Sequence, residues 1–263
     1  MSQEILYKHR QIWRQKSVLR LIYQDYYRRI VSSAQPGPTL EIGGGSGNLK
    51  DYAANVVSTD IVPLPWLDAA TDAQALAFAD DSFANVVAVD VLHHLEYPVR
   101  FLAEAQRVLR PGGRLILLEP AISPFSWVIY SLFHPEPVEM RANPLQTGSP
   151  DPSRRPFDSN QAIPTLLFGR HRDRLEAMFP TFKLETFTRL SFFAYPLSGG
   201  FRAWSLLPAA AAPILLSCEQ RLQRFLGPLM AFRLFVVMKK YPSADQQVHD
   251  PELPIRRGVT PAQ

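Results

Sequence analysis

The sequence predicts an α/β fold built on one doubly wound and mostly parallel sheet. Between residues 38 and 120, short β-branched runs alternate with amphipathic helical patterns, which is the arrangement of successive βαβ units. The first run leads directly into a glycine-rich stretch, LEIGGGSGNL, of the kind that turns tightly or comes close to a ligand. The 263 residues, 46% of them apolar and 20% charged, can bury the core that such a sheet requires.

Residues 1–36 are predicted to be helical and to form a lid over the domain. Apolar side chains recur there at three- and four-residue steps with arginines between them, and the sequence AQPGP ends the pattern. The recurring residues are Leu19, Ile22, Tyr23, Tyr26 and Ile30.

Residues 37–120 are predicted to form the core of the domain. The predicted strands cover residues 39–43, 56–61, 83–92 and 114–120, and the predicted helices cover residues 45–55 and 97–109. Two insertions follow, each with an uncharged apolar stretch. They cover residues 121–165 and 191–230, around a helix at 169–179 and strands at 182–190 and 231–240. We expect residues 1–241 to form a single domain, followed by a disordered polar tail at 242–263.

Charge and cysteine usage narrow the class of protein. Residues 37–120 carry a net charge of −6, whereas residues 1–35 and 121–263 carry +5 each, so the acidic centre argues against a nucleic-acid groove. Basic flanks beside apolar stretches fit an anionic membrane surface, although solvated helix faces explain such charges too. The single cysteine, Cys218, excludes an internal disulfide, and the charged N-terminus lacks the apolar region of a secretory signal. We therefore expect a cytoplasmic protein, with peripheral membrane contact as an open option.

The glycine-rich stretch does not match the common phosphate-binding motifs. A dinucleotide fingerprint needs a third glycine where this chain has Asn48 or Lys50, and the Gly-Lys-Ser/Thr of a Walker loop is absent. What the chain has is E-x-G-x-G-x-G, formed by Glu41, Gly43, Gly45 and Gly47. This motif resembles the nucleoside-binding loop of class I S-adenosylmethionine-dependent methyltransferases.

Further motifs extend the resemblance. TDAQALAFADDSFANVV resembles the family's D-A-x-x-L-P-F-x-D-x-S-F-D segment, VAVDVLHHL resembles the end of its fourth strand, and RVLRPGGRLILLEP resembles the helix and strand that follow. Two departures are visible: Ala77 replaces the usual proline, and Ala84 or Asn85 stands where an aspartate is common. The resemblance is close over residues 38–120 and loose over residues 166–190 and 231–240.

The resemblance implies a seven-stranded Rossmann-like sheet and S-adenosylmethionine as the cofactor. It implies that Asp60 accepts from the ribose hydroxyls, that Asp72 accepts from the adenine amino group, and that Asp90 lies near the methionine part. The full set of expected cofactor-binding residues is Glu41, Gly43, Gly44, Gly45, Gly47, Asp60, Ile61, Asp72, Ala73, Asp90 and Val91. Four carboxylates suit a cationic sulfonium and disfavour a pyrophosphate.

The methyl acceptor must be met by the parts of the chain outside these motifs. His134, with Glu136 nearby, is the first candidate for a general base, and His93 and His94 are the others; each has a structural alternative as a turn, capping or packing residue. The candidate substrate contacts are Tyr23, Tyr26, His134 and Glu136, although periodic aromatics are more often core. We assign no metal ligands.

The uncharged stretches at 120–135 and 203–218 are too short to span a membrane, which takes about 20 residues. They fit a hydrophobic tunnel for the acceptor, a surface that rests on a membrane, a cap over the acceptor site or a dimer interface. The oligomeric state is therefore left open. We therefore expect O-methylation of a small acceptor, hydrophobic or carried on a lipid. The alternatives are C-methylation of a phenolic or isoprenoid ring, a soluble or macromolecular acceptor, and an accessory protein that binds the cofactor without turnover.

Overall fold

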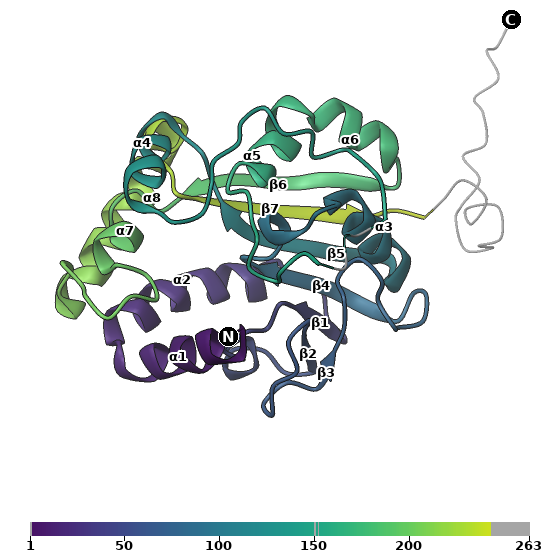
Figure 1. Ribbon diagram of the computed structural model, residues 1–263, viewed down its shortest axis with the longest axis horizontal. Helices are drawn as coiled ribbons and strands as arrows, with labels where there is room; N and C mark the ends of the chain where they lie inside the picture. The colour runs from purple at the N-terminus through teal and green to yellow at the C-terminus, as the bar shows by residue number, and fades with distance from the viewer. Residues whose placement is uncertain (1, 150, 152, 243–263) are drawn as a thin grey trace, which may run out of the picture.

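A central seven-stranded sheet with helices on both faces forms the molecule, in a computed structural model that describes residues 2–149, 151 and 153–242 (Figure 1). The strand order is β3-β2-β1-β4-β5-β7-β6, and β7 runs antiparallel to the other six strands. The strands are β1 (Thr39–Ile42), β2 (Val56–Asp60), β3 (Ala69–Ala70), β4 (Phe83–Val89), β5 (Leu109–Pro120), β6 (Phe182–Leu190) and β7 (Arg233–Lys240). This arrangement confirms the predicted fold class.

The point where the strand order reverses lies between β1 and β4. Leu40 of β1 pairs with Val57 of β2 on one side and with Val86 of β4 on the other, all in parallel. The chain winds outward from β1 to β3 and then restarts at β4. The carboxyl ends of β1, β2 and β4 therefore share one edge of the sheet, where open α/β sheets form their ligand crevice.

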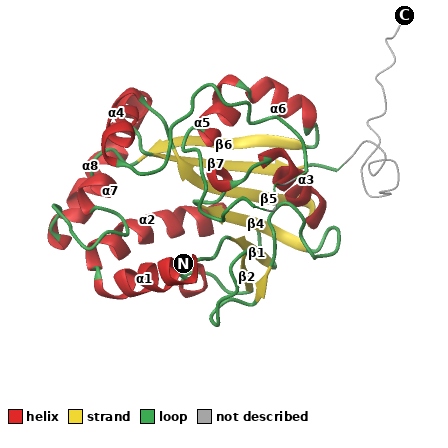
Figure 2. Cartoon of the chain, in the orientation of Figure 1, coloured by secondary structure: helices red, strands yellow, loops and turns green. Residues whose placement is uncertain are grey.

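The helices divide between the two faces and one end of the sheet (Figure 2). They are α1 (Ser2–Gln15), α2 (Ser17–Ser33), α3 (Pro98–Val108), α4 (Pro124–Phe133), α5 (Ile163–Thr165), α6 (Arg172–Met178), α7 (Ala194–Ser198) and α8 (Ala212–Met230). No helix within the described part of the chain is both long and apolar enough to cross a bilayer.

Alternating residues of the strands supply two separate cores. Val86 of β4 and Leu117 of β5 join a cluster with α3 and α6, whereas Val87 and Ile116 join a cluster with α2. Because successive side chains of a strand point to opposite faces, the near-continuous apolar runs in the sequence supply both layers at once.

The predicted helix at residues 45–55 is wrong. The segment contains only a short 3-10 turn, η1 (Leu49–Asp51), between Gly47 and Asn55, whose positive φ angles of 72° and 57° do not fit a helix. The N-terminal helix α2 covers this face of the sheet instead. Tyr27 of α2 stacks on Tyr52, with ring centroids 4.7 Å apart.

Both predicted insertions contain helices. Residues 121–165 begin with α4 and continue as a long loop, and residues 191–230 contain α7 and α8 (Figure 2). A buried carboxylate fixes the second insertion, since Glu219 of α8 accepts from the backbone N–H groups of Phe193 and Ala194, each at 2.7 Å. Of the tail expected at 242–263, residues 243–263 lie outside the described part of the chain.

Asn85, one of the departures from the family pattern, has a structural role in β4. Its fully buried amide accepts from the N–H of Gln35 at 2.7 Å, and donates to the carbonyl of Gln35 at 2.8 Å and to Thr39 Oγ1 at 3.0 Å. An aspartate could not make the two donor bonds. Asn85 therefore ties the segment after α2 to the sheet.

Replacing this amide should destabilise the protein without touching the ligand crevice. Asn85→Ala leaves the buried partners unpaired, so we expect the free energy of unfolding to fall by about 2–4 kcal/mol in urea denaturation. The matched control is Gln11→Ala on the exposed side of α1, which should change stability by less than about 0.5 kcal/mol. Equal stability of the two variants would contradict the role given to Asn85.

Candidate active site

A cleft of about 730 Å³ opens at the shared edge of β1, β2 and β4. Its floor is the glycine-rich loop and the segments that follow β2 and β4. Its walls come from α1, from α4 with the loop behind it, and from residues 195–204. The two insertions and the N-terminal helix therefore enclose the crevice that the sheet topology creates.

Most of the expected cofactor residues meet in this cleft. Those that line it are Glu41, Gly43, Gly45, Asp60, Ile61, Asp72, Ala73, Asp90 and Val91. Gly44 and Gly47 belong to the same loop but do not line the cleft, and their part in binding the cofactor stays a prediction. A Cβ atom on Gly44 would collide with Ser58 Oγ, and one on Gly47 would come within 2.7 Å of Trp66. Their lack of a side chain serves packing beneath the loop.

Asp60 holds the glycine loop in shape. Its two carboxylate oxygens accept from the N–H groups of Gly45 at 3.0 Å and Val62 at 2.9 Å. Burial raises the pKa of the Asp60 carboxyl, although these backbone bonds act in the opposite direction. Each oxygen keeps a second lone pair for a ligand hydroxyl.

Ile61 and Asp72, which follow Asp60 in the chain, offer a place for a flat, polar ring. The side chain of Ile61 lines the cleft and is 53% exposed, an unusual position for a large apolar group. Asp72 also lines the cleft, and its Oδ1 accepts from the N–H of Gln74 at 2.8 Å. An apolar surface beside a carboxylate matches an adenine face and its amino group.

Glu41 lies deeper, at the end of β1. It is almost fully buried and accepts a hydrogen bond from the hydroxyl of Ser58. Burial raises the pKa of the Glu41 carboxyl to about 7, despite that hydrogen bond. Glu41 therefore titrates in the physiological range, unlike an ordinary glutamate.

An ion pair that the sequence analysis missed lies between Asp90 and Arg233. Asp90, with a φ of 58°, follows β4, and Arg233 begins β7 with only 3% of its surface exposed. Burial alone would raise the pKa of Asp90, but the charges of Arg233 and His93 and the hydrogen bond from Arg233 together outweigh burial, and the pKa lies below its ordinary value. The guanidinium also stacks on Tyr195, 4.2 Å from its ring centroid. The only signal in the sequence was a lone arginine in the apolar run AFRLFVVM.

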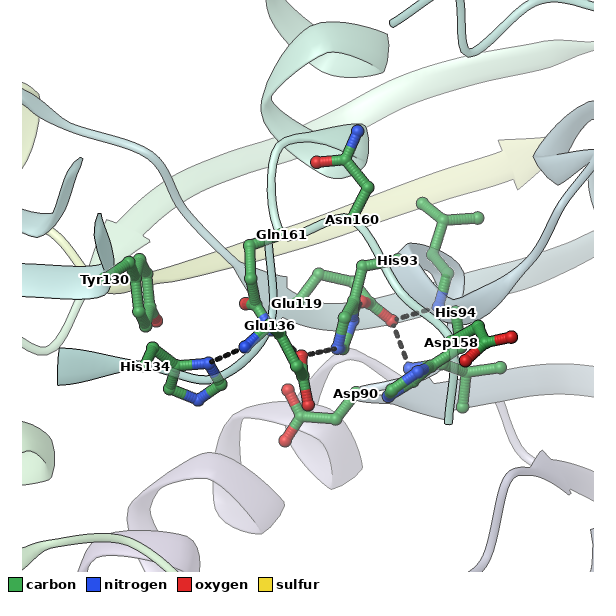
Figure 3. Close-up of polar contacts among 12 residues, drawn as sticks. Asp90, His93, His94, Glu119, Tyr130, His134, Glu136, Asp158, Asn160 and Gln161 are labelled. Atoms are coloured by element: carbon green, nitrogen blue, oxygen red, sulfur yellow. Dashed lines mark hydrogen bonds and ion pairs between the residues drawn. The ribbon is translucent and has the colours of Figure 1, made fainter. Parts of the chain in front are cut away.

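His93 lies between two carboxylates (Figure 3). Its Nδ1 is 2.8 Å from Glu119 Oε2, and its Nε2 is 3.7 Å from Glu136 Oε2. Glu119 is fully buried at the end of β5, and its other oxygen accepts from the N–H groups of Val91 and Leu92. Since the carboxylate must accept, Nδ1 carries the proton and the neutral ring has its free lone pair on Nε2.

The surroundings of His93 favour its charged form. Burial alone would lower its pKa, but the hydrogen bond with Glu119 and the negative charges nearby outweigh burial and raise the pKa above 6.5. The neighbouring His94 behaves oppositely: burial and the charge of His93 lower its pKa to about 4. Ligand atoms of His93, His94 and Glu136 lie within 4.8 Å of one another, a spacing that an imidazolium between carboxylates also explains.

His134 lies on the other side of Glu136, directly after α4 (Figure 3). Its Nδ1 accepts from the N–H of Glu136 at 3.3 Å, and its ring packs edge-on against Tyr130 with centroids 5.2 Å apart. Burial lowers the pKa of His134, so the ring is neutral near pH 7. With the Nδ1 lone pair in use, the neutral ring presents an N–H at Nε2.

The two tyrosines expected at the acceptor separate. Tyr23 lines the cleft, and its hydroxyl donates to Asp90 Oδ2 at 3.4 Å. Tyr26 does not line the cleft: it lies on the buried face of α2, and its hydroxyl forms a hydrogen bond with the hydroxyl of Ser191. The expectation for Tyr26 is therefore corrected, because on a helix packed against a sheet its position faces the core.

Comparisons with known proteins agree with this geometry. Residues 40–117 match the methyltransferase-domain family. A demethylmenaquinone methyltransferase from Renibacterium salmoninarum is 34% identical over 124 residues, which are 39% of this chain and 52% of that protein. A ubiquinone/menaquinone biosynthesis C-methyltransferase from Paracoccus denitrificans is 48% identical over 56 residues, 21% of this chain and 22% of that protein.

This chain thus spans about half the length of the first relative and less of the second. Among solved structures, the 4+2 cyclase SpnF superposes with a TM-score of 0.50 at 15% identity, over 83% of this chain and 82% of that one. At 15% identity, this similarity supports the fold and says nothing about activity. The domain match over residues 40–117, the relatives and the strand order together support a methyltransferase domain of the class I S-adenosylmethionine-dependent type.

Proposed function

We propose that the protein transfers a methyl group from S-adenosylmethionine to a hydroxyl of a small hydrophobic acceptor. The observation that carries the proposal is a single cleft with two chemically different halves. One half holds the carboxylates of Glu41, Asp60 and Asp72, and the other holds His93 between two further carboxylates.

The first half fits the cofactor. Asp60 would accept from the ribose hydroxyls, Asp72 from the adenine amino group, and Ile61 would cover the adenine face. Because Arg233 already neutralises Asp90, Glu41 is the carboxylate left to balance the positive charge of the methionine part. When bound, S-adenosylmethionine supplies a methyl group that leaves its sulfonium sulfur as the acceptor oxygen attacks.

The second half fits a general base. Glu119 orients His93 so that Nε2 carries the lone pair, and Nε2 would accept the proton of the acceptor hydroxyl as the oxygen–methyl bond forms. Glu136 would then stabilise the imidazolium. His134, which presents an N–H, is better suited to donate a hydrogen bond to the acceptor oxygen.

The acceptor side is lined with aromatic side chains, which supports a hydrophobic acceptor. They are Tyr130, Phe133, Tyr195, Phe201, Trp204 and Phe232. Both curated relatives carry quinones in their names, and the Paracoccus protein is named a C-methyltransferase. Methylation of a ring carbon of a phenol is therefore the second candidate, and the same base would serve it by forming the phenolate. The intact carboxylates argue against an accessory protein without turnover.

The cofactor assignment predicts a selective binding pattern. Calorimetry should detect S-adenosylmethionine or S-adenosylhomocysteine and no measurable NAD. Asp60→Ala should weaken that binding by about ten- to a hundred-fold, because charged hydrogen bonds to the ribose contribute roughly 1.5–3 kcal/mol. Asp173→Ala, on the exposed side of α6, is the matched control and should bind like the parent. Tight NAD binding without a response to the adenosyl compounds would refute the assignment.

The raised pKa of Glu41 predicts that cofactor binding depends on pH. A cationic ligand favours the carboxylate, which forms fully only about one unit above the pKa of about 7. Affinity for S-adenosylmethionine should therefore rise by up to about tenfold between pH 6 and pH 8. Glu41→Gln cannot titrate, so its affinity should be lower and flat across this range. An unchanged slope in that variant would exclude Glu41 as the source.

The proposed base predicts a characteristic pH–rate profile. The parent should lose kcat/KM below a pKa that lies above 6.5, since His93 must be neutral to accept a proton. Glu119→Gln removes the charge that raises this pKa, so the limb should move to lower pH while the maximal rate drops by about 10²–10⁴. The assay would use the best acceptor from a panel of prenylated and simple phenols, with the product examined for an ether or a ring methyl group.

Two further variants complete this test. Glu139→Gln changes an exposed carboxyl in the loop after α4, which also holds Glu136, and should leave the pH–rate profile unchanged. His134→Ala should lower turnover less than Glu119→Gln and should keep the acid limb. A limb that vanishes in His134→Ala and persists in Glu119→Gln would transfer the role of base to His134.

A further inference from the structure

Large apolar side chains are exposed together at one end of the molecule. This end consists of α4, residues 204–206 and α8, and we call it the apolar end (Figure 1). α4 packs against α8, and Arg202 donates to the carbonyl of Phe133 at 3.1 Å, which joins the loop to α4. We propose that the apolar end docks on an anionic phospholipid bilayer.

The helix α4 presents little but hydrocarbon to solvent. Its ten residues, PFSWVIYSLF, contain no charge. The exposed large apolar residues on it are Phe125, Trp127, Val128, Leu132 and Phe133. Only Ser126 and Tyr130 of this helix are buried, and Leu132 and Phe133 are 68% and 66% exposed, so a large apolar area of the helix is open to solvent.

The helix α8 adds a regular apolar stripe. Its exposed residues at three- and four-residue steps are Ile214, Cys218, Leu222, Phe225 and Leu229. Side chains at this spacing lie on one face of a helix. Ile214 is 70% exposed and Phe225 is 71% exposed, so the face is open rather than half covered. Leu206, in the adjoining loop, is 73% exposed.

The exposed charged residues of α8 and of the adjoining loop are all arginines. Asp25 of α2, which accepts from Gln220 of α8 at 3.0 Å, is paired with Arg29. Arg221 and Arg224 are exposed on α8 beside the stripe, and Arg202 is exposed in the loop. The one acidic residue of α8, Glu219, points inward and is buried against α7. An apolar face bordered by arginines, on a helix without an exposed acid, is suited to lie in the interface of an anionic bilayer.

The apolar end is continuous with the cleft. Phe133 and Trp204 are exposed on this surface and also line the cleft. A bilayer covering the apolar end would therefore meet the acceptor side of the cleft directly, and a hydrophobic acceptor could enter without crossing water. This route rests on the proposed function, whereas binding to the bilayer does not.

Vesicle flotation without cofactor or acceptor tests the docking itself. The parent should float with vesicles of phosphatidylcholine and phosphatidylglycerol, bind pure phosphatidylcholine more weakly, and lose affinity as salt increases. The double variant Leu222→Gln/Phe225→Gln should partition at least about tenfold less, since each side chain gives up its burial in hydrocarbon. Arg221→Gln/Arg224→Gln should lower binding to the anionic vesicles by about tenfold or more.

The matched controls lie on α6, away from the apolar end. Met178→Gln replaces an exposed apolar residue and Arg174→Gln an exposed arginine, and both should float like the parent. All variants should bind S-adenosylhomocysteine with the parent's affinity, which shows that they are folded. A failure of cofactor binding in the parent would refute the proposed function and leave the docking result standing.

Three results would overturn docking on the bilayer. The first is a parent that does not float with anionic vesicles. The second is a Leu222→Gln/Phe225→Gln variant that floats as well as the parent. The third is a parent that forms a dimer in light scattering and does not bind vesicles, together with a Leu222→Gln/Phe225→Gln variant that is monomeric. That result would assign the apolar end to a second copy of the chain.

Discussion

The buried carboxylate of Glu119 is the constraint on which the site depends. It stands at the end of β5 and accepts from the backbone of Val91 and Leu92 and from the ring of His93. These bonds fix the turn after β4, where the cofactor half of the cleft meets the acceptor half. A carboxylate with no exposure is stable there because its two oxygens have three donors, so removing one donor disturbs both halves at once.

A second buried pair divides the charge of the cleft. Asp90 and Arg233 neutralise each other at the base of the acceptor half, and tyrosine rings surround them. The carboxylates of Asp60 and Asp72 remain free to accept from a ligand, while the Asp90–Arg233 pair adds no net charge to the acceptor half. The two reactants therefore meet different surroundings within one cavity, as a charged donor and an apolar acceptor require.

Sequence patterns predicted the parts of the fold that depend on local order. The glycine motif, Asp60 and the strands of residues 38–120 follow one another in the chain, so spacing alone relates them. The helix predicted at 45–55 was wrong because Gly47 and Asn55 adopt positive φ angles, and the spacing of residues did not indicate that α2 covers this face. Arg233 was missed for the same reason, since its partner Asp90 lies on another strand's end. Tyr26 was misassigned because periodicity marks a buried face without saying what lies beneath it.

The substitution of α2 for a local helix also affects how the chain can fold. Ile22 and Tyr26 pack in one cluster with Phe235 and Val237, so the first long helix shares a core with the last strand. Contact between elements so far apart in sequence requires the closure of a long stretch of chain, and the lost chain entropy slows their association. The opposite face, where α3 packs on β4 and β5, also includes Leu234 and Val236 of β7. Both layers of the core are therefore complete only once the last strand has entered the sheet.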